Sequence, residues 1–186
     1  MTRARLGSMV GLTVLLLAPS QPASSLHAQA ASPATCSDEA IWTDIVGAER
    51  LYWEAIRALD QGEEAEKAAL LFGQSASLRV RCDPQVLPLT RMSALLYHRA
   101  GNLKEAQRTM YRAAELAART GQLLAAAHAY LDYAVLSHEL GDTDAATDAA
   151  TKAELISRLP ALSDWARSTI QDRMEWKQAA MIPSTM

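Results

Sequence analysis

The chain has 186 residues, of which 36 are Ala and 25 are Leu, against six Val and six Ile. Ala and Leu favour helices whereas β-branched residues favour strands, so this composition excludes a β-sandwich or barrel and argues against a parallel α/β sheet. The apolar content of 49% is too high for a disordered chain, and a net charge of −3 without a basic block argues against nucleic-acid binding. We therefore expect one all-α domain.

The first thirty residues have the pattern of a secretory signal peptide. Two arginines in the first five residues precede a mostly apolar stretch with three consecutive leucines at 15–17, and Ala28-Gln29-Ala30 is a small-x-small cleavage signal. We predict cleavage after Ala30 and a periplasmic or secreted protein. An uncleaved N-terminal anchor is the alternative. No later apolar stretch without charged residues is long enough to cross a membrane, so we expect no membrane-spanning helix after cleavage.

Two cysteines remain after the predicted cleavage, Cys36 and Cys82. Cysteines of exported proteins usually pair in an oxidising compartment. If one helix begins after Cys36 and its antiparallel partner ends near Cys82, the two residues lie side by side, and we predict a disulfide between them. Closing a loop of that size stabilises the fold by about 4 kcal/mol in the chain-entropy model. Two free thiols are the alternative.

The first half of the domain reads as three helices that follow a polar leader at 31–36. Ser37 is the expected N-cap of the first, whose apolar stripe begins at Ile41, and Gly62 ends it. The second is expected over 63–81 and the third over 88–100, with Met92 and Leu95 among the apolar positions of the third.

The second half of the domain reads as four further helices. Asn102 opens the fourth, which continues to the Thr120-Gly121 pair, and the fifth spans 122–140. Asp142 caps the sixth, Pro160 ends it, and Ser163-Asp164 caps the seventh. The domain is thus expected over 37–180, with a loose C-terminus at 181–186. Two pairs of tryptophans stand eleven residues apart, a spacing that we interpret as core packing: Trp42 with Trp53, and Trp165 with Trp176.

Alanines recur in a pattern that indicates repeated hairpins. The segments from Gly101 and Gly141 each continue with Asn or Asp, then Ala after five residues and again after seven more, giving Ala106 with Ala113 and Ala146 with Ala153. A looser copy from Gly62 contains Ala69 and Ala76. The offset of 40 between the two clear copies is typical of stacked helical hairpins, in which small residues let helices cross closely. A plain helical bundle with coincidental alanines is the alternative.

This pattern resembles the tetratricopeptide repeat (TPR) family, most clearly over 87–160. The resemblance implies a stack of about three antiparallel hairpins with a final capping helix, and a groove on the inner surface made by the first helix of each repeat. By that carry-over the groove would be lined by Arg91, Leu95, His98, Arg99, His128, Leu131, Val135, His138 and Glu139. Arginines and histidines there would attract an acidic or C-terminal peptide.

The sequence lacks the motifs of common catalytic and metal sites. There is no Gly-rich phosphate loop, no Gly-x-Ser-x-Gly, no Cys-x-x-Cys and no His-x-x-x-His. We therefore expect no cofactor, no metal and no catalysis, and a scaffold that binds a protein or peptide in the cell envelope. The alternatives are a small-ligand binder or enzyme with a pocket between the groove and the last helix, and a helical subunit that forms homo-oligomers.

Overall fold

The computed structural model describes residues 44–62, 64–79 and 83–181, with side chains as far as Lys177. The predicted signal peptide, the leader, Ser37 and both cysteines lie outside the described residues. Within them the chain is all-α, as predicted, and forms seven helices: α1 (Ile45–Asp60), α2 (Ala65–Ser77), α3 (Val86–Arg99), α4 (Leu103–Arg119), α5 (Leu123–Glu139), α6 (Thr143–Ser157) and α7 (Asp164–Met181).

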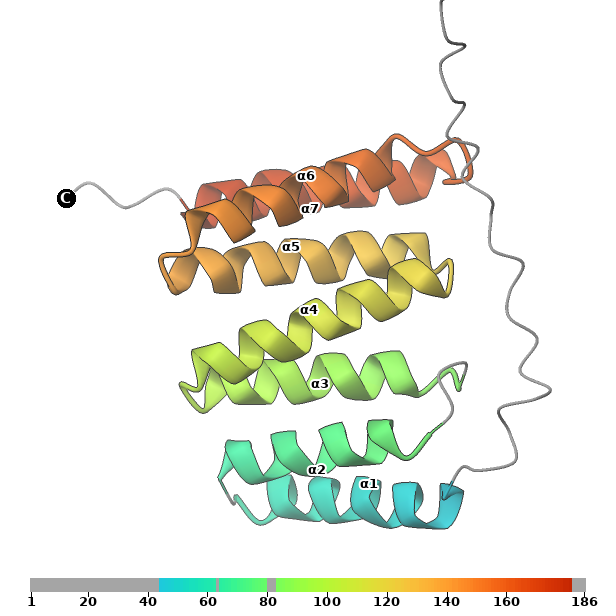
Figure 1. Ribbon diagram of the computed structural model, residues 1–186, viewed down its shortest axis with the longest axis vertical. Helices are drawn as coiled ribbons and strands as arrows, with labels where there is room; N and C mark the ends of the chain where they lie inside the picture. The colour runs from blue at the N-terminus through green and yellow to red at the C-terminus, as the bar shows by residue number, and fades with distance from the viewer. Residues whose placement is uncertain (1–43, 63, 80–82, 182–186) are drawn as a thin grey trace, which may run out of the picture.

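Consecutive helices run in opposite directions and pack against each other along the stack (Figure 1). The pairs α1–α2, α3–α4 and α5–α6 therefore form three antiparallel hairpins. α7 packs against both α5 and α6 at one end of the stack, and its Ala166 and Ile170 are buried there. The predicted stack of about three hairpins with a final helix is confirmed.

The turns after α3 and α5 have the same geometry. Gly101 and Gly141 each adopt a φ of +78°, in the left-handed region that glycine adopts at no steric cost. At the first turn the amide of Gly101 donates to the carbonyl of His98, and the amide of the next residue donates to the carbonyl of Tyr97. This is a Schellman motif, which satisfies the last carbonyls of the helix. The glycines therefore end the helices where the sequence predicted.

Three of the predicted N-caps are confirmed. Asn102 Oδ1 accepts the amide of Glu105 at 3.3 Å, and Asp142 Oδ1 accepts the amide of Ala145 at 3.1 Å. Ser163 Oγ likewise accepts the amide of Ala166 at 3.2 Å. Each cap satisfies one of the free amides at a helix start, which fixes the boundary between turn and helix.

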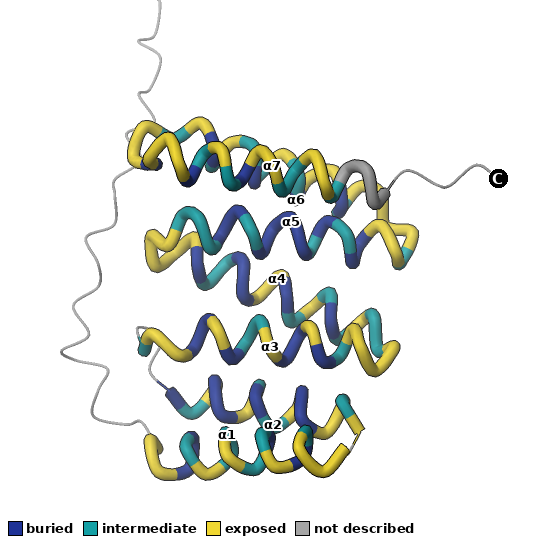
Figure 2. Tube along the Cα trace, turned by 180° about the vertical axis from the view of Figure 1, so that it is seen from behind, coloured by how far each residue is buried: buried dark blue, intermediate teal, exposed yellow. Residues whose placement is uncertain are grey.

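Small side chains form most of the core. All six alanines of the predicted repeat are buried: Ala69, Ala76, Ala106, Ala113, Ala146 and Ala153. Met110 of α4 and Ile170 of α7 are the largest fully buried side chains. Buried positions are most frequent along α5, in the middle of the second half of the stack (Figure 2). Because the core is small-residue packing, the helices lie close together, and polar side chains of neighbouring helices can meet.

Polar contacts join the first three helices. Ser75 Oγ of α2 donates to the carbonyl of Ala48 in α1 at 2.7 Å, and Ser93 Oγ of α3 donates to the carbonyl of Ala69 in α2 at 2.7 Å. Both hydroxyls are buried, so each hydrogen bond both fixes a helix crossing and satisfies a polar group in the core.

The start of α1 differs from the prediction. Asp44 is its N-cap, with Oδ1 accepting the amide of Gly47 at 2.7 Å, so α1 begins at Ile45 and not directly after Ser37. Glycine at 47 leaves room for this cap, because a Cβ there would lie 2.1 Å from Oδ2 of Asp44 and would displace the capping carboxylate. The apolar residues Ile45 and Val46 suggested a continuing stripe, but both are exposed.

The prediction that the spaced tryptophans pack in the core was wrong for the three that the structure describes. Trp53, Trp165 and Trp176 are 58%, 70% and 64% exposed. Periodicity places residues on one face of a helix but does not say that a neighbour covers that face. The same holds for Met92 and Leu95 of α3, which are exposed.

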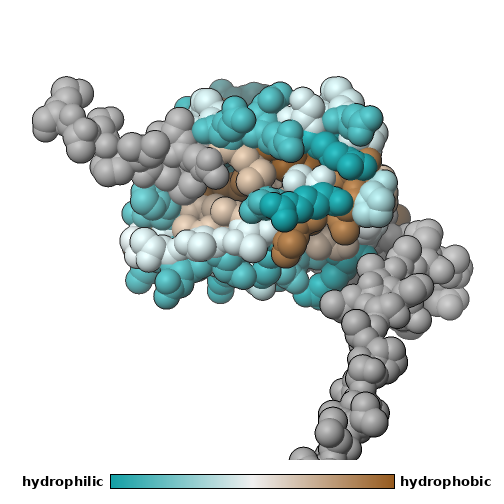
Figure 3. Space-filling view, turned by 90° about the horizontal axis from the view of Figure 1, so that it is seen from above, coloured by the Kyte–Doolittle hydropathy of each residue, from teal (hydrophilic) through white to brown (hydrophobic). Residues whose placement is uncertain are grey.

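Viewed from the α6–α7 end, apolar surface lies between two hydrophilic borders (Figure 3). Leu155 of α6 is among the exposed large apolar residues of these two helices. In the described part of the chain no helix combines the length and the apolarity needed to cross a membrane.

Candidate functional site

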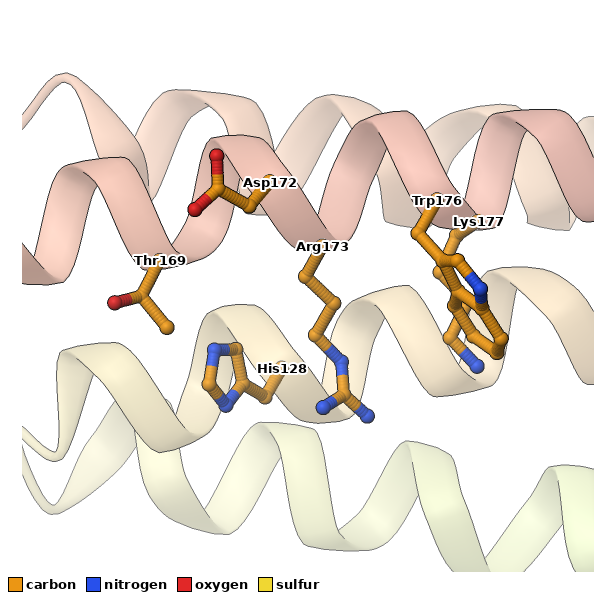
Figure 4. Close-up of a pocket in the computed structure, with 6 residues that line it drawn as sticks. All are labelled: His128, Thr169, Asp172, Arg173, Trp176 and Lys177. Atoms are coloured by element: carbon orange, nitrogen blue, oxygen red, sulfur yellow. The ribbon is translucent and has the colours of Figure 1, made fainter.

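Two hollows meet at His128 on the surface formed by α3, α5 and α7, which we call the inner face. One, of about 530 Å³, lies between His128 and the α7 residues Thr169, Asp172, Arg173, Trp176 and Lys177 (Figure 4). The other, of about 370 Å³, is lined by His128, by Arg91 of α3 and by 122–125 at the start of α5. His128 belongs to both, so the hollows lie side by side, and we call them together the groove.

Asp132, one helical turn after His128, contacts all three cationic side chains of the groove. Its Oδ2 accepts Arg91 Nη2 of α3 at 3.0 Å, and its Oδ1 accepts Arg173 Nη2 of α7 at 2.7 Å. Lys177 Nζ of α7 lies 3.3 Å from the same Oδ1. One buried carboxylate therefore connects three helices of the inner face, and it positions two arginines beside His128.

The burial of Asp132 would by itself raise the pKa of its carboxyl group. The hydrogen bond from Arg173, together with the charges of Arg173, Lys177 and Arg91, outweighs that effect and lowers the pKa below its usual value. Asp132 is therefore ionised at neutral pH. It neutralises only one of its three cationic partners, and Asp172, the other acid of the groove, is exposed.

The surroundings of His128 disfavour the charged form of its imidazole. Burial lowers the pKa of its imidazole, and the charges of Arg173 and Arg91 lower it further, against a weaker opposing effect of Asp132. The ring is thus neutral at pH 7. With neutral His128, the cations Arg91, Arg173 and Lys177 against two carboxylates leave the groove with one net positive charge.

Unpaired buried nitrogens are concentrated at this groove. Among the described residues, four buried side-chain nitrogens make no hydrogen bond, and three of them are Arg91 Nε, His128 Nε2 and Arg173 Nε. Buried polar atoms in native proteins almost always have a partner. Three of the four therefore lie beside the surplus positive charge of the groove.

Trp176 adds an apolar surface at the edge of the groove. Its ring is largely exposed, and Lys177 Nζ lies 4.7 Å from the ring centroid in a cation–π contact. A side chain of this kind can pack against an apolar part of a ligand whose charged part meets the arginines. The groove therefore offers both charge and aromatic contact from the same helix.

Two of the nine residues predicted to line the groove, Arg91 and His128, do so. His98 and Glu139 lie further along α3 and α5, where His98 Nε2 and Glu139 Oε2 are 2.8 Å apart. Leu131 lies in the core and is not available to a ligand. Of the other four, Leu95, Arg99 and His138 are exposed and Val135 is half-buried.

Sequence reasoning missed Asp132, Arg173 and Lys177. A signal was present, because Asp132 is the only acid in the otherwise mostly apolar stretch 123–137, four residues after His128. Arg91, Asp132 and Arg173 also share one offset of 41 residues, close to the repeat offset of 40. Neither pattern says which helix faces which, so the contact itself required the structure.

The described part of the chain contains no group of three or more His, Cys, Asp or Glu residues placed to hold a metal ion. No protein-family model matches the chain, and no curated protein or solved structure is significantly similar to it. The groove itself is therefore the basis for a functional proposal.

Proposed function

We propose that the protein is a non-catalytic scaffold that binds a protein or peptide in the groove of its inner face. The observation that carries the proposal is that α3, α5 and α7, which are far apart in the chain, contribute side chains to one groove around His128. The resemblance to the TPR family, in which such a surface binds peptides, supports the same function. The signal-peptide pattern supports a place in the cell envelope.

The chemistry of the groove favours an acidic segment or a chain end as the bound part of the partner. Arg91, Arg173 and Lys177 supply charge-assisted donors, and Trp176 supplies an aromatic surface beside them. A peptide with a carboxylate next to an apolar residue matches both features.

A pull-down from cell-envelope extracts tests this proposal. The double variant Arg173→Gln/Lys177→Gln should lose a partner that the original chain retains, because two of the three groove cations are neutralised. The matched control is Lys104→Gln/Arg112→Gln, which neutralises two exposed cations of α4, outside the groove. Circular dichroism would establish that both variants are folded. Equal retention by all three proteins would contradict the proposal.

A second candidate function has its own observation. The hollow of about 530 Å³ lies between His128 and α7, and its volume is within the range of small-molecule sites. A small-ligand binder, or an enzyme that uses this hollow, would retain a bound compound during purification. Native mass spectrometry would reveal it as a mass above that of the chain, displaced in Arg173→Gln.

A third candidate function, homo-oligomerisation, is favoured by the exposed apolar residues of α1. Val46 and Trp53 stand seven residues apart, two turns along one face of this helix, and both are exposed. Size-exclusion chromatography at several concentrations would show a mass that rises with concentration in the original chain and not in Val46→Lys/Trp53→Lys.

A further inference from the structure

We propose that His128 is the proton-accepting residue of an oxyanion site, at which an oxyanion contacts His128 and the partly exposed guanidinium groups of Arg91 and Arg173 while His128 takes up one proton. The inference rests on the proposed function for the source of the oxyanion, which is a carboxylate of the bound peptide. The site itself follows from the two arginines that Asp132 holds beside His128 in the groove.

The internal carboxylate cannot fill this role, because both of its oxygens are occupied. Asp132 Oδ2 accepts Arg91 Nη2, and Oδ1 accepts Arg173 Nη2 and contacts Lys177 Nζ. Each arginine uses an Nη2 for Asp132, and its Nε stays buried without a hydrogen bond. Asp132 thus holds both guanidinium groups in place, and the two side chains remain 28% and 34% exposed, which leaves part of each accessible to a second anion.

His128 stands where both arginines can contribute to the same ligand. It shares one hollow with Arg173, as Figure 4 shows, and the other with Arg91. Its Nε2 is buried without a partner. A protonated imidazole carries a positive charge and a donor on each ring nitrogen, so protonation makes His128 a third cation toward the ligand. One oxyanion beside the ring then meets the charges of all three side chains.

The charged groups around His128 come from three helices. Arg91 belongs to α3, Arg173, Lys177 and Asp172 belong to α7, and Asp132 is on α5 itself. The helices α4 and α6 present their charges to a different part of α5. Glu115 of α4 accepts the hydroxyl of Tyr130 at 2.7 Å, and Lys152 of α6 lies 5.5 Å from the centroid of that ring. Two residues along a helix is about 200° of rotation, so Tyr130 and His128 face opposite directions.

These neighbours couple the binding of the oxyanion to the protonation of His128. Without a ligand, burial and the two arginines lower the pKa of His128, so the imidazole is neutral at pH 7. An anion in the groove offsets the arginine charges and attracts the imidazolium, which raises the pKa of the bound form. Binding then includes proton uptake by His128. The affinity for the anion must therefore rise as the pH falls from the pKa of the bound form to the pKa of the free form.

The test measures the pKa of His128 by NMR in the full chain, with and without three probes. Sodium acetate is a free carboxylate, a capped tetraglutamate peptide offers only side-chain carboxylates, and acetylated tetra-alanine offers only a C-terminal carboxylate. At least one peptide should raise the pKa of His128 and leave His138, exposed on the same helix, unchanged. That peptide should bind about tenfold more tightly near pH 5.5 than near pH 7.5, because one neighbouring charge shifts a pKa by about 1–3 units.

Two variants distinguish proton uptake by His128 from the effect of the overall charge of the groove. His128→Gln should bind the probe no more tightly near pH 5.5 than near pH 7.5, whereas His138→Gln should keep the tenfold difference. The inference is overturned if His128 titrates identically with and without every probe, or if His128→Gln retains the pH dependence.

The outcomes also distinguish this inference from the proposed function. If acetate raises the pKa of His128 but no envelope protein is retained by the groove, the oxyanion site stands and the peptide scaffold fails. If Arg173→Gln/Lys177→Gln loses a partner whose binding leaves the pKa of His128 unchanged, the scaffold stands and the oxyanion site fails.

Discussion

The carboxylate of Asp132 accepts a hydrogen bond of 2.7 Å from Arg173, which stands 41 positions later in the chain. Arg91, which donates to the other oxygen of Asp132, stands 41 positions earlier. An Arg–Asp–Arg row thus runs across α3, α5 and α7. Its middle member is buried and the two arginines border the groove, so the row contributes both to the stability of the stack and to the charge of the site.

Replacement of Asp132 tests the structural part of this row. Asp132→Asn leaves Arg91, Arg173 and Lys177 close together without a counter-charge. Breaking a fully buried pair costs about 3–5 kcal/mol, but the side chains of Arg91 and Arg173 are 28% and 34% exposed, so water screens part of the repulsion. We expect a loss of about 2 kcal/mol in the free energy of unfolding, measured with urea.

The matched control for that loss is Asp148→Asn. Asp148 also pairs with a lysine, Lys152 at 2.9 Å, but its side chain is exposed. An exposed pair contributes at most about 0.5–1 kcal/mol. A similar loss in both variants would mean that the burial of Asp132 is unimportant.

Acidification tests the environment of His128. Its pKa in the folded chain is lowered, so the unfolded chain binds the proton more readily, and stability from this residue is present above the unfolded pKa of about 6.5 and lost as the pH falls through the folded pKa. The free energy of unfolding should therefore decline below about pH 6.5. The decline should be shallower in His128→Gln. Identical slopes in the original chain and in this variant would refute the lowered pKa.

Substitution of Gly101 tests the turn after α3. Gly101→Ala places a side chain at a φ of +78°, and a Cβ there meets no atom within 4 Å, so the cost is conformational only. We expect a loss of about 1–2 kcal/mol in thermal or urea unfolding. Gly101→Asn should lose less, because Asn tolerates the left-handed region. An equal loss in the two variants would point to a cause other than backbone conformation.

Enlargement of one core alanine tests the close helix packing. Ala113 is fully buried in α4, and Ala113→Leu has no space for three further carbon atoms, so we expect a loss of at least about 1–3 kcal/mol. Ala118→Leu, at an exposed position of the same helix, should change the stability by less than about 0.5 kcal/mol. A tolerated Ala113→Leu would show that the helices are more loosely packed than the structure describes.

The predicted pairing of Cys36 with Cys82 is tested by alkylation of the purified protein without a reductant. If the disulfide forms, neither thiol gains the mass of the reagent until a reductant is added. Reduction should then lower the stability by about 4 kcal/mol in the chain-entropy model. Modification of both cysteines in the non-reduced protein would show that the thiols are free.

The helices from α3 onward could be predicted closely from the sequence, because local chemistry determines their ends. Gly101 and Gly141 require a left-handed backbone, and Asn102 and Asp142 cap the next helix, whatever the remaining fold. At the N-terminal end the sequence analysis named Ser37 as the cap, by residue type alone. The contact of Asp44 with the amide of Gly47 identifies the cap of α1.

The groove was predictable only in part, because its residues meet through tertiary contacts. Arg91 and His128 could be placed on the inner face by the repeat pattern. Leu131 could not be separated from them, because it is only three residues from His128 and the width of the buried stripe depends on the neighbouring helices. The partners of Asp132 lie 41 residues away on either side, beyond the reach of any helical periodicity.

The equal geometry of the turns at Gly101 and Gly141 has a consequence for the length of the stack. Excision of 101–140 would join Ala100 directly to Gly141 and rebuild the same turn, so backbone geometry alone would permit a shorter protein. The excised stretch contains Asp132, however, and the shortened chain would bring Arg91 and Arg173 onto neighbouring helices with no acid between them. The number of hairpins therefore affects the charge pattern of the inner face as well as the packing, because removal of this unit also removes the acid that pairs with both arginines.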